Sequence, residues 1–375
     1  QVGTGNIAGC ASALVSGGPG AVFWMWVSAF FGMATIYGEA VLAQKYKTVG
    51  EDGAVSGGPI YYIKAAFKGK LGTFMAGFFA VAIILALGFM GNMVQSNSIG
   101  DAFFTAFGVP KIAVGIVVAA VSAFIFLGGV KRIAAITEKL VPIMAIFYIC
   151  GALIAIGMNA QNILPAFKSI FVGAFSPEAV MGGAIGISIK EAVRFGVARG
   201  LFSNEAGMGS TPHAHAMAKV AKPQDQGAVA MVGVFIDTFI VLTMTALVIL
   251  TSGMLGTTGA DGQMLTATAL AQAAFNNSFG SFGNIFVAIC LLFFAFSTIV
   301  GWYFFGEANV KALFKGSKKA TVAYGVIALV FIVVGSFQKV GLVWDMSDMF
   351  NGLMVIPNLL AVLALSGLAA NFSKD

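Results

Sequence analysis

Long apolar runs separated by short polar segments dominate the chain. After a shorter run at residues 4–16, such runs lie near residues 20–44, 72–107, 112–127, 136–158, 179–202, 227–252, 282–306, 320–337 and 341–366. A helix needs about 20 apolar residues to cross a bilayer. The pattern therefore predicts an all-α polytopic membrane protein, with a half-span and nine further spans in one membrane domain covering residues 1–375.

Glycine interrupts the first apolar run, where a helix would otherwise be continuous. The sequence Val2-Gly3-Thr4-Gly5-Asn6 contains two glycines, and each costs a helix about 1 kcal/mol relative to alanine. Unwound backbone within a membrane is tolerated around a buried cavity, where freed N–H groups bind carboxylates and freed carbonyls bind cations. We therefore predict a binding site here. Helix packing through Gly5-x-x-x-Gly9 is the alternative.

The sixth apolar run is also interrupted by glycine. Gly182–Gly186 and then Phe195-Gly196 break it, beside the charged residues Lys190, Glu191 and Arg194. Broken helices at corresponding positions of two halves indicate an inverted-repeat transporter with a binding site near the middle of the membrane. With the first helix completed, the chain fits a five-plus-five inverted-repeat helix bundle.

Composition and charge support a membrane protein and indicate its orientation. Only 10% of the residues are charged, against about 25% in an ordinary soluble domain. Of the basic residues outside the sixth run, 15 fall in alternate loops that we place inside and 3 (Lys111, Lys168 and Lys339) in loops that we place outside. This asymmetry follows the positive-inside rule, so it predicts a cytoplasmic C-terminus and accounts for the net charge of +6 without a nucleic-acid partner.

Polar residues within the third run offer a second candidate element. Gln95 and Ile99 are four residues apart and share one helix face, so a polar head and an aliphatic wall can face one cavity. The neighbouring Ser96, Asn97 and Ser98 also fit interhelical hydrogen bonding, each bond contributing about 1 kcal/mol. We favour the pocket.

The remaining candidate functional residues carry two hydroxyl groups and four carboxylates. Ser297 and Thr298, together with a freed carbonyl such as that of Val2, can form an oxygen cage for a monovalent cation; bonding back to their own helix is the alternative. Acidic residues inside membranes are by default functional. Here we favour ion pairs with Arg194 or Arg199, or gate contacts, for Glu39, Glu205, Asp237 and Glu307.

Five ordered motifs resemble the alanine/glycine:cation symporter family, and the likeness covers essentially the whole chain. They are Gly3-Thr4-Gly5-Asn6-Ile7 with Gly17–Trp26, Gly57–Tyr62, Gly91–Ile99, Arg199–Gly207 and Phe235–Thr238. The resemblance implies a leucine-transporter-like fold and sodium-coupled symport of alanine or glycine into the cell by alternating access. Members of this family carry sequence before the first motif, so we expect a truncated first helix and poor transport by residues 1–375 alone.

The resemblance also implies roles for individual residues. By this resemblance, Thr4 and Gly5 meet the substrate carboxylate and Trp302 faces the substrate side chain. The shared helix face described above places Gln95 and Ile99 in the pocket lining. Phe195 closes the other wall, with Phe202 as the less favoured choice. Sodium is expected at Val2, Asn6, Ser297 and Thr298.

Other functional classes have less support in the sequence. The chain has two histidines, His213 and His215, with no evident nucleophile or third metal ligand, so we do not expect an enzyme. A proton-coupled carrier of another small zwitterion and an ion channel remain the alternatives. We expect a monomer in the plasma membrane, the inner membrane of a bacterial cell, with sodium as coupling ion and no cofactor.

Overall fold

The computed structural model describes residues 2–49, 55–177, 180, 188–260 and 262–372, with the side chains of 129–138 excepted. The described helices are α1 Cys10–Gly17, α2 Gly20–Tyr46, α3 Pro59–Ala66, α4 Gly69–Ile83, α5 Asn92–Phe107, α6 Lys111–Phe126, α7 Gly129–Met158, α8 Ile163–Phe175, α10 Ile189–Asn204, α11 Pro212–Met217, α12 Pro223–Val234, α13 Thr243–Ser252, α14 Ala267–Phe279, α15 Phe282–Leu313, α16 Lys318–Ser336, α17 Val340–Ala364 and α18 Ser366–Phe372. Strands β1 Thr48–Val49 and β2 Val55–Ser56 form a small antiparallel hairpin.

Three π-helical segments and one 3-10 turn join or begin these helices. They are η1 Gly5–Gly9, η2 Ile84–Gly91, η4 Phe235–Leu242 and the 3-10 turn η3 Ala160–Asn162. Through η2 and η4, the chain runs as single long helices over Gly69–Phe107 and Pro223–Ser252. Such π-bulges often mark functional sites, because the wider turn redirects side chains and frees backbone groups.

The described helices agree with most of the predicted spans. Seven are long and apolar enough to cross a membrane: Gly20–Tyr46, Gly69–Phe107, Lys139–Met158, Pro223–Ser252, Phe282–Leu313, Lys318–Ser336 and Val340–Ala364. The predicted span 112–127 appears as the 16-residue helix α6. Large apolar side chains are exposed along the outward faces, Phe31, Phe124 and Ile143 among them, as expected for contact with lipid. The prediction of an all-α polytopic membrane protein is confirmed.

Several helices were not predicted. Helix α14 lies between the predicted runs 227–252 and 282–306, and α3, α8, α11 and α18 are also additional. Each is 6 to 13 residues long, too short to cross a bilayer as a helix. A search for long apolar runs therefore does not detect them.

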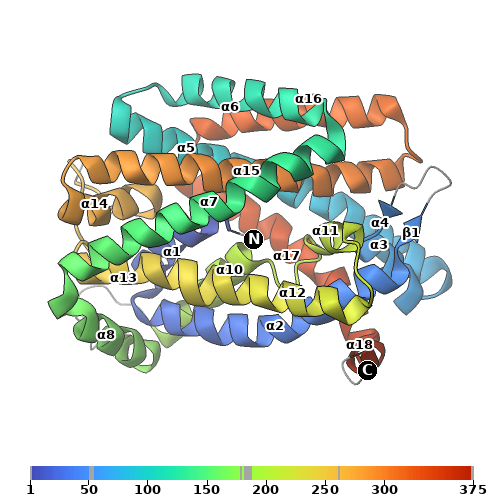
Figure 1. The fold of residues 1–375 in the computed structure, drawn as a ribbon, viewed down its shortest axis with the longest axis horizontal. Coiled ribbons are helices and arrows are strands. Elements are labelled where there is room, and N and C mark those ends of the chain that lie inside the picture. The colour runs from blue at the N-terminus through green and yellow to red at the C-terminus, as the bar shows by residue number, and fades with distance from the viewer. Residues whose placement is uncertain (1, 50–54, 178–179, 181–187, 261, 373–375) are drawn as a thin grey trace.

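The long helices run side by side along the longest axis of the molecule (Figure 1). Helix α2 packs against α10 and α12, α15 packs against α5, and α16 packs against α5 and α6. The hairpin, α3, α11 and the α15–α16 connection lie at one end, and α8 and α14 at the other (Figure 1). The loops and helix ends around the first end contain Lys45, Lys47, Lys64, Lys68, Lys70, Lys219, Lys222, Lys311, Lys315, Lys318 and Lys319. We call it the lysine-rich end.

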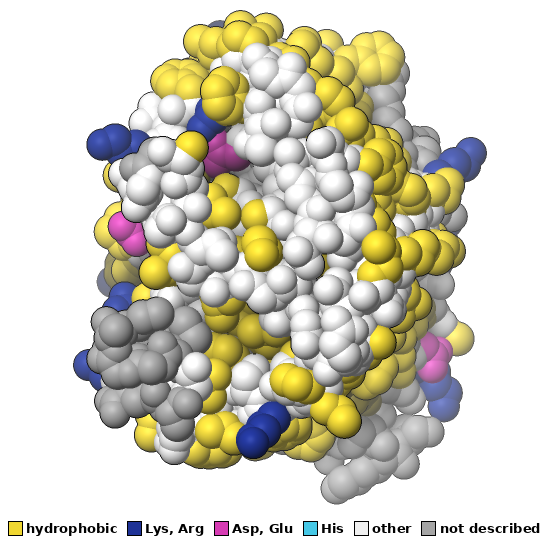
Figure 2. Space-filling model, turned by 90° about the vertical axis from the view of Figure 1, so that its left-hand side faces the viewer, with side chains coloured by type: hydrophobic (Ala, Val, Ile, Leu, Met, Phe, Trp, Pro, Cys, Tyr) yellow, Lys and Arg dark blue, Asp and Glu magenta, His cyan; other side chains and the backbone are white. Residues whose placement is uncertain are grey.

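The opposite end carries fewer charges. Figure 2 looks at this α8–α14 end and shows scattered charged side chains around a mostly uncharged centre. Helix α18 lies near the lysine-rich end, where the Lys45 ammonium sits 6.0 Å from the Phe372 ring centroid (Figure 1). Eleven of the 15 basic residues that we assigned to one side of the membrane thus lie at one end of the bundle.

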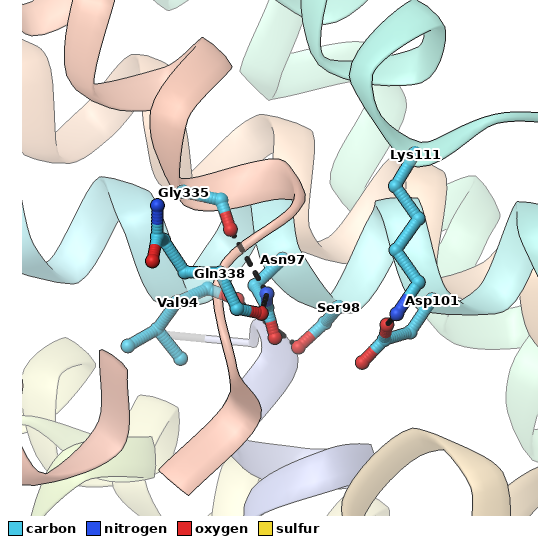
Figure 3. A network of polar contacts seen from close by, with 7 residues as sticks. All are labelled: Val94, Asn97, Ser98, Asp101, Lys111, Gly335 and Gln338. Atoms are coloured by element: carbon cyan, nitrogen blue, oxygen red, sulfur yellow. Dashed lines mark hydrogen bonds and ion pairs between the residues drawn. The ribbon is translucent and has the colours of Figure 1, made fainter. Parts of the chain in front are cut away.

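Polar residues near the C-terminal half of α5 join neighbouring helices. The Asn97 amide donates to the carbonyls of Gly335 (2.9 Å) and Gln338 (2.8 Å), and Lys111 pairs with Asp101 (Figure 3). A Cβ added to Gly335 would lie 2.5 Å from the Met93 backbone, so α16 and α5 are in close contact. Asn97 therefore serves interhelical bonding, the alternative weighed above for this polar cluster.

Candidate substrate and cation site

The first helix begins at Thr4. Val2 and Gly3 are not helical, whereas Gly5 and Gly9 lie in the π-helical segment η1 that continues into α1. The Gly3 N–H donates to Asn6 Oδ1 at 2.8 Å, so the asparagine caps this helix start. A Cβ on Gly5 would lie 2.9 Å from the Ser203 Cα, and Gly5 is therefore required for close packing against α10.

The structure describes one of the two breaks predicted for the sixth run. Gly182–Gly186 lies outside the described residues, and α10 continues unbroken through Phe195 and Gly196. A Cβ on Gly196 would lie 2.5 Å from the Ala21 carbonyl oxygen, so this glycine permits the close approach of α2 and does not unwind the helix. The prediction of a break at Phe195-Gly196 is wrong.

The observed interruption is Glu205–Thr211, between α10 and α11, which we call the unwound segment. All seven residues are buried, and Glu205, Gly207 and Gly209 have φ values of 59°, 86° and 77°. The buried Glu39 carboxylate on α2 accepts hydrogen bonds from the Gly207 and Gly209 N–H groups, both at 2.9 Å. Buried non-helical backbone needs such partners, because an unpaired N–H group inside a membrane costs several kcal/mol, in rough terms.

Several predicted substrate residues converge at the start of α1. The Thr4 N–H donates to Gln95 Oε1 at 3.2 Å, and the buried Thr4 hydroxyl has no hydrogen-bond partner. The Trp302 indole N–H donates to Glu205 Oε1 at 2.9 Å. A Cβ on Gly91 would lie 2.4 Å from the Trp302 ring, so the end of η2 packs tightly against this tryptophan of α15.

Phe202 takes the position that we assigned to Phe195. Its ring meets the Trp302 ring edge-on with centroids 5.5 Å apart, and a Cβ on Gly5 would lie 3.2 Å from Phe202 Cδ1. Phe195 lies seven residues earlier on α10, half-buried, with the Arg194 guanidinium 5.3 Å from its ring centroid. Ile99 is fully buried in a separate apolar cluster with Val114 and Ile299. Phe202 thus lies between Gly5 and Trp302, and a hydrogen bond joins the neighbouring Thr4 to Gln95.

The predicted cation ligands fall into two groups. Thr298 Oγ1 lies 2.9 Å from the Phe294 carbonyl oxygen of its own helix and 3.4 Å from the Val2 carbonyl oxygen. Ser297 Oγ donates to the Phe294 carbonyl at 2.9 Å. The Asn6 amide instead donates to Asp237 Oδ1 (2.7 Å). Val2 and Thr298 are therefore together, and Asn6 belongs to a second polar group.

That second group centres on Asp237, which our list of site residues omitted. Asp237 is fully buried in η4 and accepts hydrogen bonds from the Asn6 amide and the hydroxyls of Ser203 and Thr238. These three partners are neutral, while Arg199 pairs with Asp348 on α17 at 2.6 Å. The ion pair expected between Arg199 and a buried carboxylate is thus wrong for Asp237. A carboxylate within a predicted span was the available signal, because such groups are usually functional.

Comparison with known proteins identifies the family. A family model described as the sodium:alanine symporter family matches residues 1–375. The chain is 44% identical over 376 residues to the sodium/alanine symporter AgcS of Methanococcus maripaludis, covering 100% of this chain and 81% of that protein. The chain belongs to the sodium:alanine symporter family. It is therefore a multi-pass membrane transporter, and its relatives are not enzymes.

Two further relatives show how the family varies. The chain is 43% identical over 376 residues to the amino-acid carrier protein AlsT and 42% identical over 375 residues to the probable sodium/glutamine symporter GlnT, both of Bacillus subtilis, covering all of this symporter chain and 77% and 76% of those proteins. A crystal structure of a manganese transporter mutant from Eremococcus coleocola aligns with a TM-score of 0.52 at 16% identity, covering 96% of this chain and 76% of that one. This structural likeness concerns the fold alone.

Proposed function

We propose that this symporter carries alanine or glycine into the cell together with sodium, by alternating access across the plasma membrane with its C-terminus in the cytoplasm. The observation that carries the proposal is the meeting of Thr4, Gln95, Phe202 and Trp302 between the start of the first helix and the unwound segment. Free polar groups near a helix start bind a carboxylate, and tightly packed rings leave room for a small side chain.

The partnerless Thr4 hydroxyl supports this placement of the carboxylate. Buried polar groups are normally hydrogen-bonded, so an orphan group needs an explanation. A substrate carboxylate accepting from Thr4 Oγ1 supplies one. The family members named above for alanine and for glutamine differ in substrate size, and the Phe202–Trp302 pair favours the smaller substrate here.

For sodium, two positions have suitable oxygen atoms. One lies between the Val2 carbonyl and Thr298 Oγ1, which are 3.4 Å apart. The other lies at Asp237, where a cation would neutralise a carboxylate whose described partners Asn6, Ser203 and Thr238 are uncharged. Hard monovalent cations favour such carbonyl, hydroxyl and carboxylate ligands. Asp237→Asn should remove the dependence on sodium if its charge holds the ion.

Uptake of labelled alanine into liposomes tests the proposal. We expect uptake driven by an inward sodium gradient, competed by glycine and weakly by leucine. A proton gradient that drives uptake equally well without sodium would favour the proton-coupled alternative, for which a relative described as a putative sodium/proton-dependent alanine carrier is the precedent. Flux without any gradient coupling would favour a channel.

A further inference from the structure

A cavity of about 700 Å³ lies at the lysine-rich end, apart from the candidate substrate site. The hairpin, α3, α11 and α15 form its walls, and Ser56, Tyr61, His213, Asn309 and Lys311 are among its lining residues. Nothing in the site described above uses this space. Its walls carry both signs of charge, since Glu307 and Lys311 form an ion pair at 3.1 Å, and this suits a zwitterion.

His213 and Asn309 form the inner boundary of this cavity. His213 Nδ1 lies 2.8 Å from the Ser210 carbonyl, and its Nε2 lies 2.8 Å from the Asn309 amide nitrogen. A carbonyl can only accept, so Nδ1 carries the proton and Nε2 accepts from Asn309, which also donates to the Phe305 carbonyl at 2.7 Å. The histidine is thus held as one neutral tautomer.

Aromatic and backbone contacts fix the histidine from other sides. Its ring stacks on Phe79 with an interplanar angle of 12° and lies 5.6 Å from the Phe305 ring centroid. A Cβ on Gly58 would lie 2.8 Å from His213 Cδ2, so the start of α3 closes against the ring. The buried His213 therefore fills the space between three elements.

A chain of hydrogen bonds connects this boundary to the substrate site. Ser210, whose carbonyl accepts from His213, donates through its hydroxyl to Glu205 Oε2. Glu205 Oε1 accepts from the Trp302 indole. The connection runs along the unwound segment, whose backbone lacks the regular hydrogen bonds of a helix. A movement at one end can therefore reach the other end without breaking helical hydrogen bonds.

We propose that the cavity is the vestibule through which the amino acid leaves toward the lysine-rich face, and that the Asn309–His213–Ser210 chain is the lock between it and the substrate site. This inference rests on the proposed function. Opening the lock separates Asn309 from His213 and frees the unwound segment to move with Glu205 away from Trp302. The vestibule then receives the substrate between the charges of Glu307 and Lys311.

Thiol labelling tests both parts of this proposal. The background carries Cys150→Ala, because Cys10 and Cys290 are buried and Cys150 is exposed. Ser56→Cys places a thiol in the cavity wall, and Met208→Cys places one on the unwound segment, where the buried Met208 packs in the cluster with Phe202 and Trp302. Both are treated with a membrane-impermeant maleimide in sealed vesicles of either orientation, without substrate.

We expect Ser56→Cys to react from the lysine-rich face alone. Met208→Cys should react about fivefold faster when Asn309→Ala or His213→Ala is added, as the loss of one hydrogen bond predicts. His213→Gln, whose amide can both donate to Ser210 and accept from Asn309, should restore the slow rate. Tyr61→Phe, in the cavity wall but outside the chain, is the matched control and should leave the rate unchanged.

Reaction of Ser56→Cys from the opposite face would overturn the vestibule. Thermal unfolding checks that each variant is folded. If the thiol of Met208→Cys is labelled at the same rate in all folded variants, the proposed lock is wrong. Alanine uptake by the parent protein in the same vesicles is scored separately. Failure of the proposed substrate is thereby distinguished from failure of the vestibule, because labelling needs no substrate.

Discussion

The adjacent hydroxyl groups of Ser297 and Thr298 on α15 differ in their hydrogen-bond partners. Thr298 contacts both the Phe294 and Val2 carbonyls, whereas the hydrogen bond of Ser297 goes to Phe294. Such back-bonding satisfies a hydroxyl within its own helix, so it gives no reason for a cation to bind there. The carbonyl of the non-helical Val2 beside Thr298 is what distinguishes the two.

We therefore expect Thr298→Ala to raise the sodium concentration for half-maximal alanine uptake by about 5- to 30-fold, the equivalent of about 1–2 kcal/mol for one lost ligand. Ser297→Ala should have a much smaller effect. Sodium titrations of initial uptake rates measure both. Equal shifts in the two variants would contradict this assignment.

The aromatic residues around the substrate allow a second paired test. Trp302→Ala should let valine or leucine compete with alanine, because the removed ring opens space that a steric wall had excluded. Phe202→Ala should weaken alanine binding, whereas Phe195→Ala, half-buried beneath Arg194, should leave it nearly unchanged. Competition profiles for all three are the measurement, and a larger effect of Phe195→Ala would place the substrate elsewhere along α10.

At the scale of elements, the unwound segment depends on a partner from another helix. Glu39 accepts from two of its backbone N–H groups and from the Asn358 amide, whose oxygen in turn accepts from Tyr62. Four elements, α2, α3, α17 and the unwound segment, therefore share one buried hydrogen-bond network. The unwound segment is stabilised because this network replaces the backbone hydrogen bonds that a helix would supply.

Glu39→Gln should destabilise the protein by about 1–3 kcal/mol, because the amide offers one acceptor oxygen in place of two and leaves a buried N–H unpaired. Thermal unfolding in detergent measures this change. Glu307→Gln is the control, since its partner Lys311 is half-exposed and such pairs contribute about 0–1 kcal/mol. Equal losses in both variants would show that Glu39 does not support the segment.

Helix α11 contributes a pH dependence through His213. Burial lowers the pKa of His213 from 6.5 to about 4. The unfolded chain therefore binds a proton that the folded one does not over this range, so stability falls as pH drops from 6.5 toward 4. We expect the melting temperature to fall between about pH 7 and pH 5.

The His213→Gln variant isolates this contribution. Its melting temperature should depend less on pH over the same interval, and the dependence that remains includes His215 on the same helix, whose pKa burial also lowers to about 4. An unchanged pH dependence in the variant would assign the effect to other groups.

At the scale of the whole molecule, the lysine-rich end defines an orientation. The loops with most basic residues gather there, and loops retained on the cytoplasmic side are enriched in lysine and arginine. We expect a thiol at Ser317 to be labelled from the cytoplasm and one at Gly259 from outside. Impermeant labelling of intact cells and of inverted vesicles checks this. Labelling of both from one side would refute the arrangement of loops.

The sequence by itself determined the membrane class, most spans and the charge asymmetry. These features follow from local quantities, since the transfer of an apolar run into lipid depends on its length and composition. Thr4 and Trp302 were proposed through the family resemblance, and Gln95 because it is a polar residue within an apolar run. Their mutual contacts did not follow from that pattern.

Tertiary structure alone decided where the sixth run unwinds and which aromatic residue meets Trp302. Glycine at Gly5 and Gly196 fits unwinding and close packing equally well in the sequence, and only the positions of Ser203 and Ala21 show that both pack. Likewise, Phe195 and Phe202 lie on one helix, and the neighbours on α1 and α15 select Phe202. The physical reason is that helix-forming tendency and hydropathy are properties of one segment, whereas a binding wall is formed by several segments that meet only in the folded protein.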